Sequence, residues 1–81
     1  MKKVIYIGAS WCPQCKVLRP QVEAYCKGKE VPFIYVDADE QENIVQMYGV
    51  RNLPTIIVLV DDEIVARGTG IADWSKVKES V

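Results

Sequence analysis

The sequence predicts an α/β fold whose elements follow the order βαβαββα around a four-stranded mixed sheet with helices on both faces. Three observations predict it. Apolar runs of strand length recur at residues 4–7, 33–36 and 56–60, and the segments between them carry apolar residues at the three- and four-residue spacing of a helix. An Asp-Asp turn then joins the third run to a fourth at 64–67, as in a hairpin. Because a helix separates the first two strands, we expect these strands to be parallel.

The first helix follows the first strand directly. Apolar residues at helical spacing run from Cys15 to Cys26. Pro13 fits the first turn, where its missing N–H costs nothing, and Pro20 is expected to kink the helix without ending it, because the periodicity resumes beyond it. The Lys-Gly-Lys sequence at 27–29 is expected to end the helix.

The middle of the chain predicts a short helix and a central strand. Ile44, Val45 and Tyr48 mark the helix, and Gly49 follows as its end. Residues 56–60 are continuously apolar and mostly β-branched, which is typical of a strand buried on both faces. Its hairpin partner is expected to be antiparallel and to lie at the edge of the sheet.

The last segment predicts a third helix. Asp73 can cap it, and Trp74, Val77 and Val81 then share one face. The chain has 81 residues and contains no linker, repeat or low-complexity stretch, so we expect residues 1–81 to form a single domain.

Composition limits the partners. The formal net charge is −1, with 10 basic and 11 acidic residues scattered along the chain, so no long-range basic field attracts nucleic acid or an anionic membrane. No apolar run approaches the roughly 18 residues of a membrane-spanning helix, and the apolar stretch near the N-terminus is too short for the core of a signal peptide. We therefore expect a cytoplasmic monomer that binds neither nucleic acid nor membrane.

Residues 11–15 read Trp-Cys-Pro-Gln-Cys and lie between the first strand and the first helix, which makes thiol–disulfide exchange the leading hypothesis. If Cys12 opens the helix, the unpaired N–H groups and the positive end of the helix dipole lower the pKa of its thiol below the ordinary value of about 8.5. Cys15 then lies one turn further on the same face, from which it can attack a mixed disulfide formed at Cys12.

Other interpretations of the cysteines stay open. Cys12 and Cys15 could be a structural pair or half of a zinc site. Such a site needs four ligands, and Cys26 is the only other thiol in a chain without histidine. Cys26 continues an apolar helical stripe, so we interpret it as a core residue without a catalytic role.

With the redox motif at 11–16 placed between a strand and a helix, the chain resembles the thioredoxin superfamily over nearly its whole length. Pro20 stands where this family has a helix-kinking proline. Leu-Pro-Thr at 53–55 is similar to its cis-proline loop, and Gly-Thr-Gly at 68–70 to the glycine after its fourth strand. The resemblance implies a minimal thioredoxin fold.

The resemblance also implies residue roles and partners. Cys12 would be the nucleophile and Cys15 the resolving cysteine of a protein-disulfide reductase that binds no cofactor and works through its own redox-active disulfide. The electron donor would be a thioredoxin-reductase-like flavoprotein, with glutathione as second choice, and the substrates disulfide-containing proteins. The substrate-binding residues would be Trp11, Pro13, Leu53, Pro54 and Gly70, with the Leu53-Pro54 bond in the cis form.

The chain departs from the family at two positions. Tyr6 stands where thioredoxins have a buried acid, and Tyr35 where they have a charged residue on the next strand. The chain also begins at the redox-motif strand, which gives it the size of a glutaredoxin. The alternative functions are therefore a glutathione-dependent, glutaredoxin-like reductase, a non-catalytic binding module on this fold, and a cysteine-ligated metal dimer.

Each candidate residue has a plain structural interpretation as well. Trp11 could be ordinary packing, Pro54 a strand-entry residue, and Gly70 a turn glycine. Lys16 and Arg19 could tune the thiolate or be solvated helix residues. We expect Tyr6 to pack beneath the first helix, with its hydroxyl bound to a partner.

Overall fold

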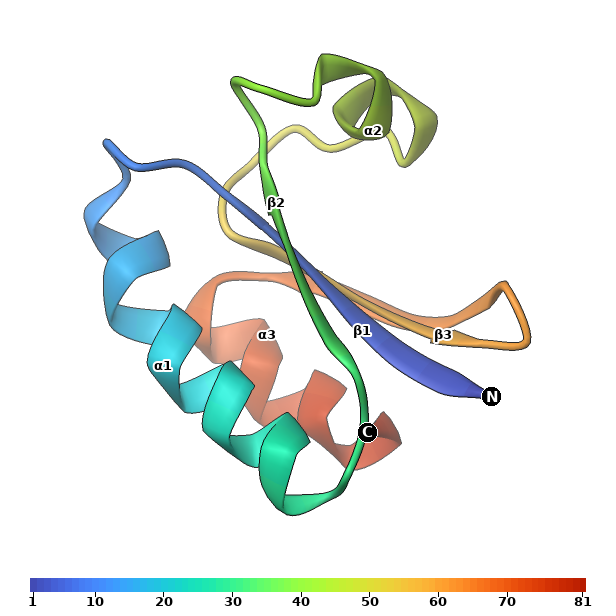
Figure 1. Cartoon of the computed structure of the whole chain (residues 1–81). Helices are drawn as coiled ribbons and strands as arrows, with labels where there is room; N and C mark the ends of the chain where they lie inside the picture. The colour runs from blue at the N-terminus through green and yellow to red at the C-terminus, as the bar shows by residue number, and fades with distance from the viewer.

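The computed structural model describes residues 1–81 and has the predicted order of elements, with one additional short helix at the end (Figure 1). The elements are β1 (Lys2–Gly8), α1 (Pro13–Gly28), β2 (Phe33–Asp37), α2 (Glu42–Met47), β3 (Thr55–Val60), β4 (Glu63–Thr69), α3 (Gly70–Val77) and the 3₁₀ helix η1 (Lys78–Ser80). No helix has the length and apolarity that a membrane span needs.

The four strands form one mixed sheet in the order β2-β1-β3-β4. As predicted, β1 and β2 are parallel, and the β3–β4 hairpin is antiparallel with β4 at an edge. The register places Tyr6 of β1 between Tyr35 of β2 and Ile56 of β3. The carboxyl ends of the parallel strands β1 and β2 therefore meet at one edge of the sheet, and the loop that carries the redox motif begins there.

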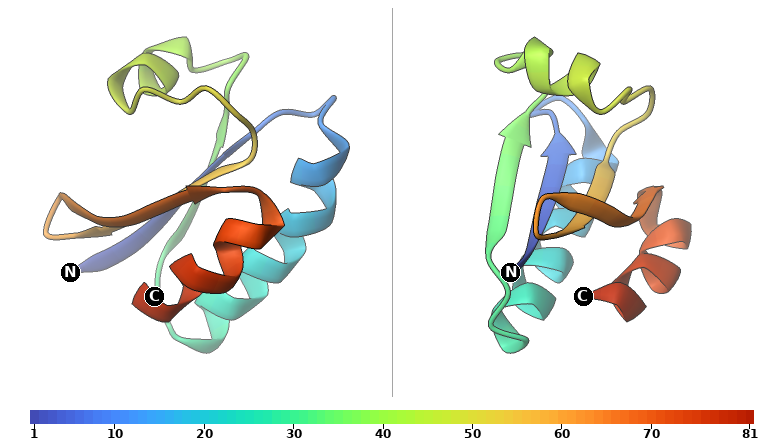
Figure 2. Two further views of the ribbon diagram at one scale, coloured as in Figure 1. Left: turned by 180° about the vertical axis from the view of Figure 1, so that it is seen from behind. Right: turned by 90° about the vertical axis from the view of Figure 1, so that its right-hand side faces the viewer.

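The helices cover both faces of the sheet. α1 and α3 lie side by side on one face, and α2 lies beyond the carboxyl end of β2 on the other (Figures 1 and 2). The core beneath α1 and α3 consists of Val4, Tyr6, Leu18, Val22, Cys26, Ile56, Val58, Trp74, Val77 and Val81. The core on the α2 side consists of Ile5, Ile7, Val36, Ile57 and Leu59.

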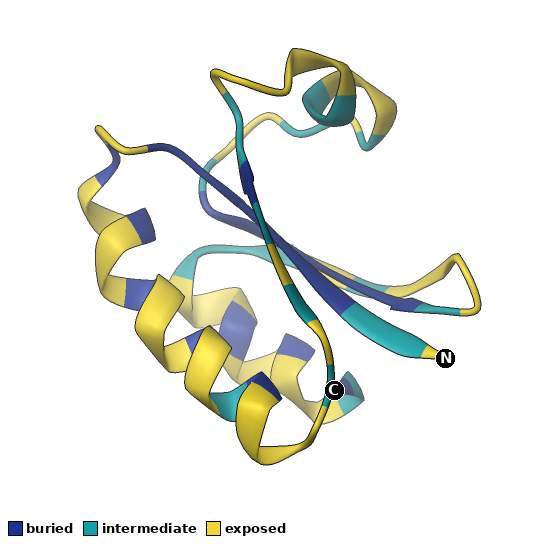
Figure 3. Ribbon diagram, in the orientation of Figure 1, coloured by how far each residue is buried: buried dark blue, intermediate teal, exposed yellow.

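Helix α1 presents one apolar stripe to the sheet and a solvated face to water (Figure 3). Its buried residues are Cys15, Leu18, Val22 and Cys26, spaced by three and four as the sequence predicts. Pro20 lies within the helix, which continues to Gly28, and Lys29 is the C-cap. This stripe fixes the rotation of α1 and so determines where its first turn points.

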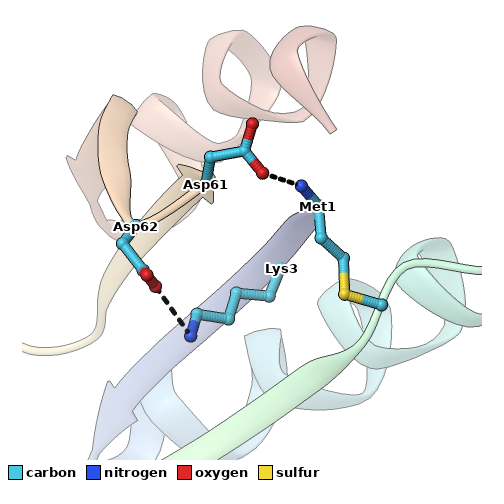
Figure 4. A network of polar contacts seen from close by, with 4 residues as sticks. All are labelled: Met1, Lys3, Asp61 and Asp62. Atoms are coloured by element: carbon cyan, nitrogen blue, oxygen red, sulfur yellow. Dashed lines mark hydrogen bonds and ion pairs between the residues drawn. The ribbon is translucent and has the colours of Figure 1, made fainter.

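The β3–β4 hairpin turns at Asp61 and Asp62, which have positive φ angles of 51° and 68°. Two consecutive residues of this kind fit the twist of a tight hairpin. Figure 4 shows that the same two carboxylates pair with the start of β1: Asp61 binds the amino group of Met1, and Asp62 lies 3.4 Å from the Lys3 Nζ. These pairs are largely exposed and lie at the end of β1 that is remote from the redox motif, so they contribute to the hairpin and not to the site.

The predicted start of the last helix is wrong. α3 begins at Gly70 with Thr69 as its N-cap, so Asp73 lies in the first turn and is not the cap. Its Oδ2 instead accepts a hydrogen bond from the backbone N–H of Thr69 at 2.8 Å. The α-helix also ends at Val77, and Val81, though buried with Trp74 and Val77, follows a 3₁₀ turn.

The early start of α3 depends on a close approach of β4 to the helix. A Cβ atom on Gly68 would lie 2.6 Å from the Asp73 Cβ and 3.0 Å from the Val77 Cγ2. Gly70 has a φ of +76°, in the left-handed region that favours glycine. The Gly-Thr-Gly segment therefore lets the chain turn from β4 directly into α3.

Candidate active site

The Cys12–Cys15 pair lies where β1 leads into α1. Cys12 is the N-cap of the helix, and Pro13 follows at its first position. The two cysteines form a disulfide with their Cα atoms 5.3 Å apart, and the Cys12 Sγ accepts a hydrogen bond from the Cys15 N–H at 3.2 Å. Cys12 retains 6% of its surface exposed and Cys15 2%. The pair is thus nearly buried, and Cys12 is the more accessible member.

The end of β1 lies directly behind Cys15. A Cβ atom on Gly8 would come within 3.1 Å of the Cys15 Cβ and 3.2 Å of its Sγ, so a side chain at this position would push against the disulfide. Local sequence patterns do not indicate this role for Gly8. Its role depends on the distance between β1 and α1, which local patterns do not specify.

Tyr6 also supports Cys15 from β1. Its side chain is fully buried in the core, as predicted, and its hydroxyl donates a hydrogen bond to the Cys15 carbonyl oxygen at 2.8 Å. Burial and, to a lesser extent, nearby Tyr35 raise the pKa of Tyr6 to about 12, against the opposing effect of the positive charge of Arg19. The hydroxyl therefore stays protonated and acts as a hydrogen-bond donor that anchors the first turn of α1.

The loop before β3 reaches the redox pair from another side. The Leu53-Pro54 bond is cis, as the resemblance implied. Leu53 packs against the small cluster of Ala9, Cys12 and Cys15. Pro54 is buried, and its carbonyl oxygen accepts a hydrogen bond from the Gly70 N–H at 3.0 Å. The structure thus brings Leu53, Pro54 and Gly70 together.

Trp11 stands beside the pair with 65% of its surface exposed. Its indole Nε1 donates a hydrogen bond to the Asp39 Oδ2 at 2.7 Å, which orients the ring. Asp39 was not among the expected site residues, although its place in the sequence, just after the second strand, indicates it. Residues that follow the parallel strands β1 and β2 lie at the same edge of the sheet.

An apolar groove of about 330 Å³ lies on the α3 side, beside the Pro13-Gln14 segment that separates the two cysteines. It is lined by Pro13, Gln14, Val17, Leu18 and Ile71. Val17 and Ile71 are 62% and 60% exposed, so the groove presents two aliphatic side chains to solvent. Neither residue was expected at the site, because Val17 belongs to the outer face of α1 and Ile71 was expected to precede the last helix.

A polar cavity of about 350 Å³ borders the pair on its β2 side. Its lining consists of Ala9, Ser10, Cys15, Lys16, Arg19, Tyr35 and Asp37. The Arg19 guanidinium carbon lies 3.7 Å from the centroid of the Tyr35 ring, a cation–π contact. Burial raises the pKa of Tyr35, Asp37 raises it further and Arg19 opposes the shift, so this hydroxyl is also a neutral group.

Cys26 lies outside the site. It is fully buried in the core beneath α1 and α3, as predicted. Burial raises the pKa of its thiol to about 11, with a further contribution from Glu23, so Cys26 stays protonated and unreactive near neutral pH. The structure contains no group of three or more His, Cys, Asp or Glu side chains placed to hold a metal ion.

Taken together, a disulfide at the N-terminus of a helix, beside a cis-proline loop and on a mixed four-stranded sheet, defines a thiol–disulfide exchange protein. Comparison with known proteins identifies the family. The family model described as Thioredoxin matches residues 1–81.

Individual proteins that are similar to this chain support the same family. The thioredoxin of Bacillus subtilis (strain 168) is 32% identical over 75 residues, which cover 90% of this chain and 72% of that protein. The thioredoxin of Malassezia sympodialis is 35% identical over 81 residues, which cover 96% of this chain and 76% of that protein. The X-ray structure of Fasciola hepatica thioredoxin matches with a TM-score of 0.86 and 35% identity, over 98% of this chain and 76% of that chain.

The chain belongs to the thioredoxin family. It is a protein thiol–disulfide oxidoreductase whose redox pair is Cys12 and Cys15. These findings confirm the predicted fold and activity, and they favour them over the glutaredoxin-like reductase, the binding module and the metal dimer.

Proposed function

We propose that Cys12 is the nucleophile and Cys15 the resolving cysteine. Cys12 is the more exposed of the two and caps the helix, so its sulfur lies at the positive end of the helix dipole. The first turn of α1 contains no acidic residue to oppose a thiolate there. Its sulfur already accepts the Cys15 N–H, a hydrogen bond that favours the charged form.

The proposed cycle transfers one disulfide bond. The Cys12 thiolate attacks one sulfur of the target disulfide, a mixed disulfide forms, and the other target sulfur leaves as a thiolate that takes up a proton. The Cys15 thiol loses its proton and attacks the Cys12 sulfur. The Cys12–Cys15 disulfide forms, and the second target sulfur leaves reduced. The target gains two electrons and two protons, and the redox pair loses them.

We infer that the substrate contacts are made by Trp11, Pro13, Leu53, Pro54 and Gly70. Leu53 packs on the cysteine cluster, and Gly70 is hydrogen-bonded to the carbonyl of Pro54, which supports a shared surface around Cys12. The Pro54 ring is buried, so this loop would meet a substrate mainly through the backbone of Leu53. Trp11 offers a large exposed ring held by Asp39.

The chemistry of this surface around Cys12 also indicates the partners. Disulfide-containing proteins are the proposed substrates, because the exposed apolar area beside Gly70 suits a protein surface better than a small charged thiol. A thioredoxin-reductase-like flavoprotein is the proposed electron donor, with glutathione second. We further propose a cytoplasmic, monomeric, single-domain protein in electron transport and redox homeostasis, which works without a bound cofactor and binds neither nucleic acid nor membrane.

An insulin-disulfide reduction assay tests this function and its donor together. The protein is assayed with NADPH and a thioredoxin reductase, and in parallel with glutathione, glutathione reductase and NADPH. We expect turnover with the first system to exceed turnover with the second by about tenfold or more. A Cys26→Ala variant is the matched control and should retain this activity. Efficient turnover with glutathione alone would favour the glutaredoxin-like alternative.

A further inference from the structure

The polar cavity beside Cys15 contains the groups that can affect how this thiol loses its proton. In the resolving step proposed above, the Cys15 thiol must lose its proton while it is almost wholly enclosed by protein. The groups that face it come from three elements. Tyr6 belongs to β1, Tyr35 and Asp37 belong to β2, and Lys16 and Arg19 belong to α1.

The two tyrosines do not supply the needed base. The Tyr6 hydroxyl is already used as a donor to the Cys15 carbonyl, and burial keeps both hydroxyls protonated at neutral pH. The charged groups of the cavity are two cations and one carboxylate, so its net charge is positive. A positive surrounding favours the thiolate form of a neighbouring cysteine.

Arg19 is the cation of this cavity that an aromatic ring holds in place. It follows Cys15 by four residues on α1, so the two side chains leave the same face of the helix on adjacent turns. Its guanidinium is held 3.7 Å from the Tyr35 ring centroid, on the wall of the cavity that Cys15 also lines. The positive charge of Arg19 lowers the pKa of the Tyr6 hydroxyl, which donates a hydrogen bond to the Cys15 carbonyl oxygen. The electrostatic field of Arg19 therefore reaches the first turn of α1.

We propose that Arg19, docked on the Tyr35 ring, is a positioning residue for the resolving step, whose charge stabilises the Cys15 thiolate across the polar cavity. The proton of Cys15 leaves to solvent through that cavity. Arginine suits this role because it remains charged at every pH where the protein is folded and because its planar group stacks on an aromatic ring. The proposal rests on the proposed roles of Cys12 and Cys15.

A reaction with dithiodipyridine separates the two steps. The reduced protein is mixed in a stopped-flow instrument with one equivalent of this neutral disulfide. Attack by Cys12 breaks the reagent's S–S bond, forms a mixed disulfide and releases one thiopyridone. Attack by Cys15 on the Cys12 sulfur then closes the Cys12–Cys15 disulfide and releases the second. The pH profile of each phase is recorded for the wild type, Arg19→Gln, Arg19→Lys and Lys27→Gln.

Arg19→Gln should move the pH midpoint of the second phase upward by about half to one unit and leave the first phase within experimental error. Arg19→Lys, which keeps the charge, should retain most of the wild-type profile. Lys27→Gln removes one positive charge at the far end of α1 and should have no effect. A second phase in Arg19→Gln that coincides with the wild type would overturn the proposal.

Three outcomes separate a failure of this inference from a failure of the proposed function. An equal shift in Arg19→Lys and Arg19→Gln would assign the effect to lost packing of the guanidinium and also overturn the electrostatic role. If the wild type releases only one thiopyridone, the proposed roles of Cys12 and Cys15 fail. If it releases two in separate phases and the second phase of Arg19→Gln coincides with that of the wild type, the proposed function stands and this inference does not.

Discussion

The Cys12–Cys15 disulfide has two flanks of similar size and opposite chemistry. The apolar groove on the α3 side, about 330 Å³, presents the exposed aliphatic side chains Val17 and Ile71. The polar cavity on the β2 side, about 350 Å³, presents two cations and a carboxylate. The same helix, α1, forms one wall of each, because its successive side chains point to different sides.

We infer from this difference that the two flanks have different roles in the reaction. Exposed aliphatic area gains free energy when a protein surface covers it, so the apolar groove suits substrate docking. Charged groups lose their solvation when they are covered, so the polar cavity suits exchange of a proton with water. Substrate can then occupy one flank while Cys15 is deprotonated from the other.

The largest expected effect comes from the cysteines that both flanks share. Cys12→Ser should reduce insulin-disulfide reduction to the uncatalysed background, because no other accessible thiol replaces its sulfur. Cys15→Ser should also stop turnover, but it should accumulate a mixed disulfide with the substrate that non-reducing electrophoresis detects. A mixed disulfide that forms in Cys12→Ser and not in Cys15→Ser would reverse the two roles.

The second prediction concerns the stability of a variant that disturbs only the apolar flank. Gly68→Ala places a Cβ 2.6 Å from the Asp73 Cβ, so α3 and with it Ile71 must move. We expect a loss of about 1–3 kcal/mol in the free energy of unfolding, measured by chemical denaturation. Gly28→Ala is the matched control, since its Cβ would meet nothing within 4 Å, and it should be neutral or slightly stabilising.

The dithiodipyridine reaction shows whether Gly68→Ala also affects the polar flank. Gly68→Ala disturbs only the apolar side, so both phases of the small-disulfide reaction should keep their wild-type pH profiles while insulin reduction slows. A change in the second phase as large as that of Arg19→Gln would show that the two flanks are not independent.

The third prediction concerns docking on the apolar groove. Ile71→Ser removes exposed aliphatic area beside Gly70 and should lower kcat/KM for insulin by about three- to tenfold, with little effect on a small disulfide. Val65→Ser removes a comparably exposed aliphatic side chain from β4, which lines neither flank, and should leave both substrates unaffected. Equal losses in the two variants would argue against a specific docking surface.

The smallest effect concerns the core beneath the pair, at alkaline pH. Burial raises the pKa of Cys26 from 9.0 to about 11, so the fold favours the protonated thiol. The resulting stability is fully present below pH 9 and is lost as the pH rises through 11. The free energy of unfolding of the wild type should therefore fall more steeply over this range than that of Cys26→Ala. Parallel curves would contradict the protonated, buried thiol.

The sequence predicted the parts of this molecule that local patterns control. The strand before Cys12 and the proline after it predicted a helix that begins at the redox pair. The apolar spacing from Cys15 to Cys26 predicted the buried stripe of α1, and Cys26 within it. The cis form of the Leu53-Pro54 bond came from family resemblance and not from spacing.

Contacts between distant elements could not be predicted in this way. Asp73 is a good local cap, but the close approach of Gly68 to α3 moves the start of the helix to Gly70. The stacking of Arg19 on Tyr35 joins α1 to β2 and depends on how the crossover places them. The partner of the Tyr6 hydroxyl depends likewise on the register of β1 beneath α1. The Arg19–Tyr35 contact belongs to the polar flank, so the role of that flank is visible only in the structure.

The difference between the two flanks can be measured directly by NMR. The Cys15→Ser variant is linked through Cys12 to a single-cysteine peptide from a protein substrate, and its backbone amide shifts are compared with those of the reduced, unlinked variant. We predict that the largest changes beyond the redox motif occur at Val17, Leu53, Gly70 and Ile71. Changes concentrated instead at Ser10, Arg19, Tyr35 and Asp37 would mean that the substrate docks on the polar flank, and would contradict the account.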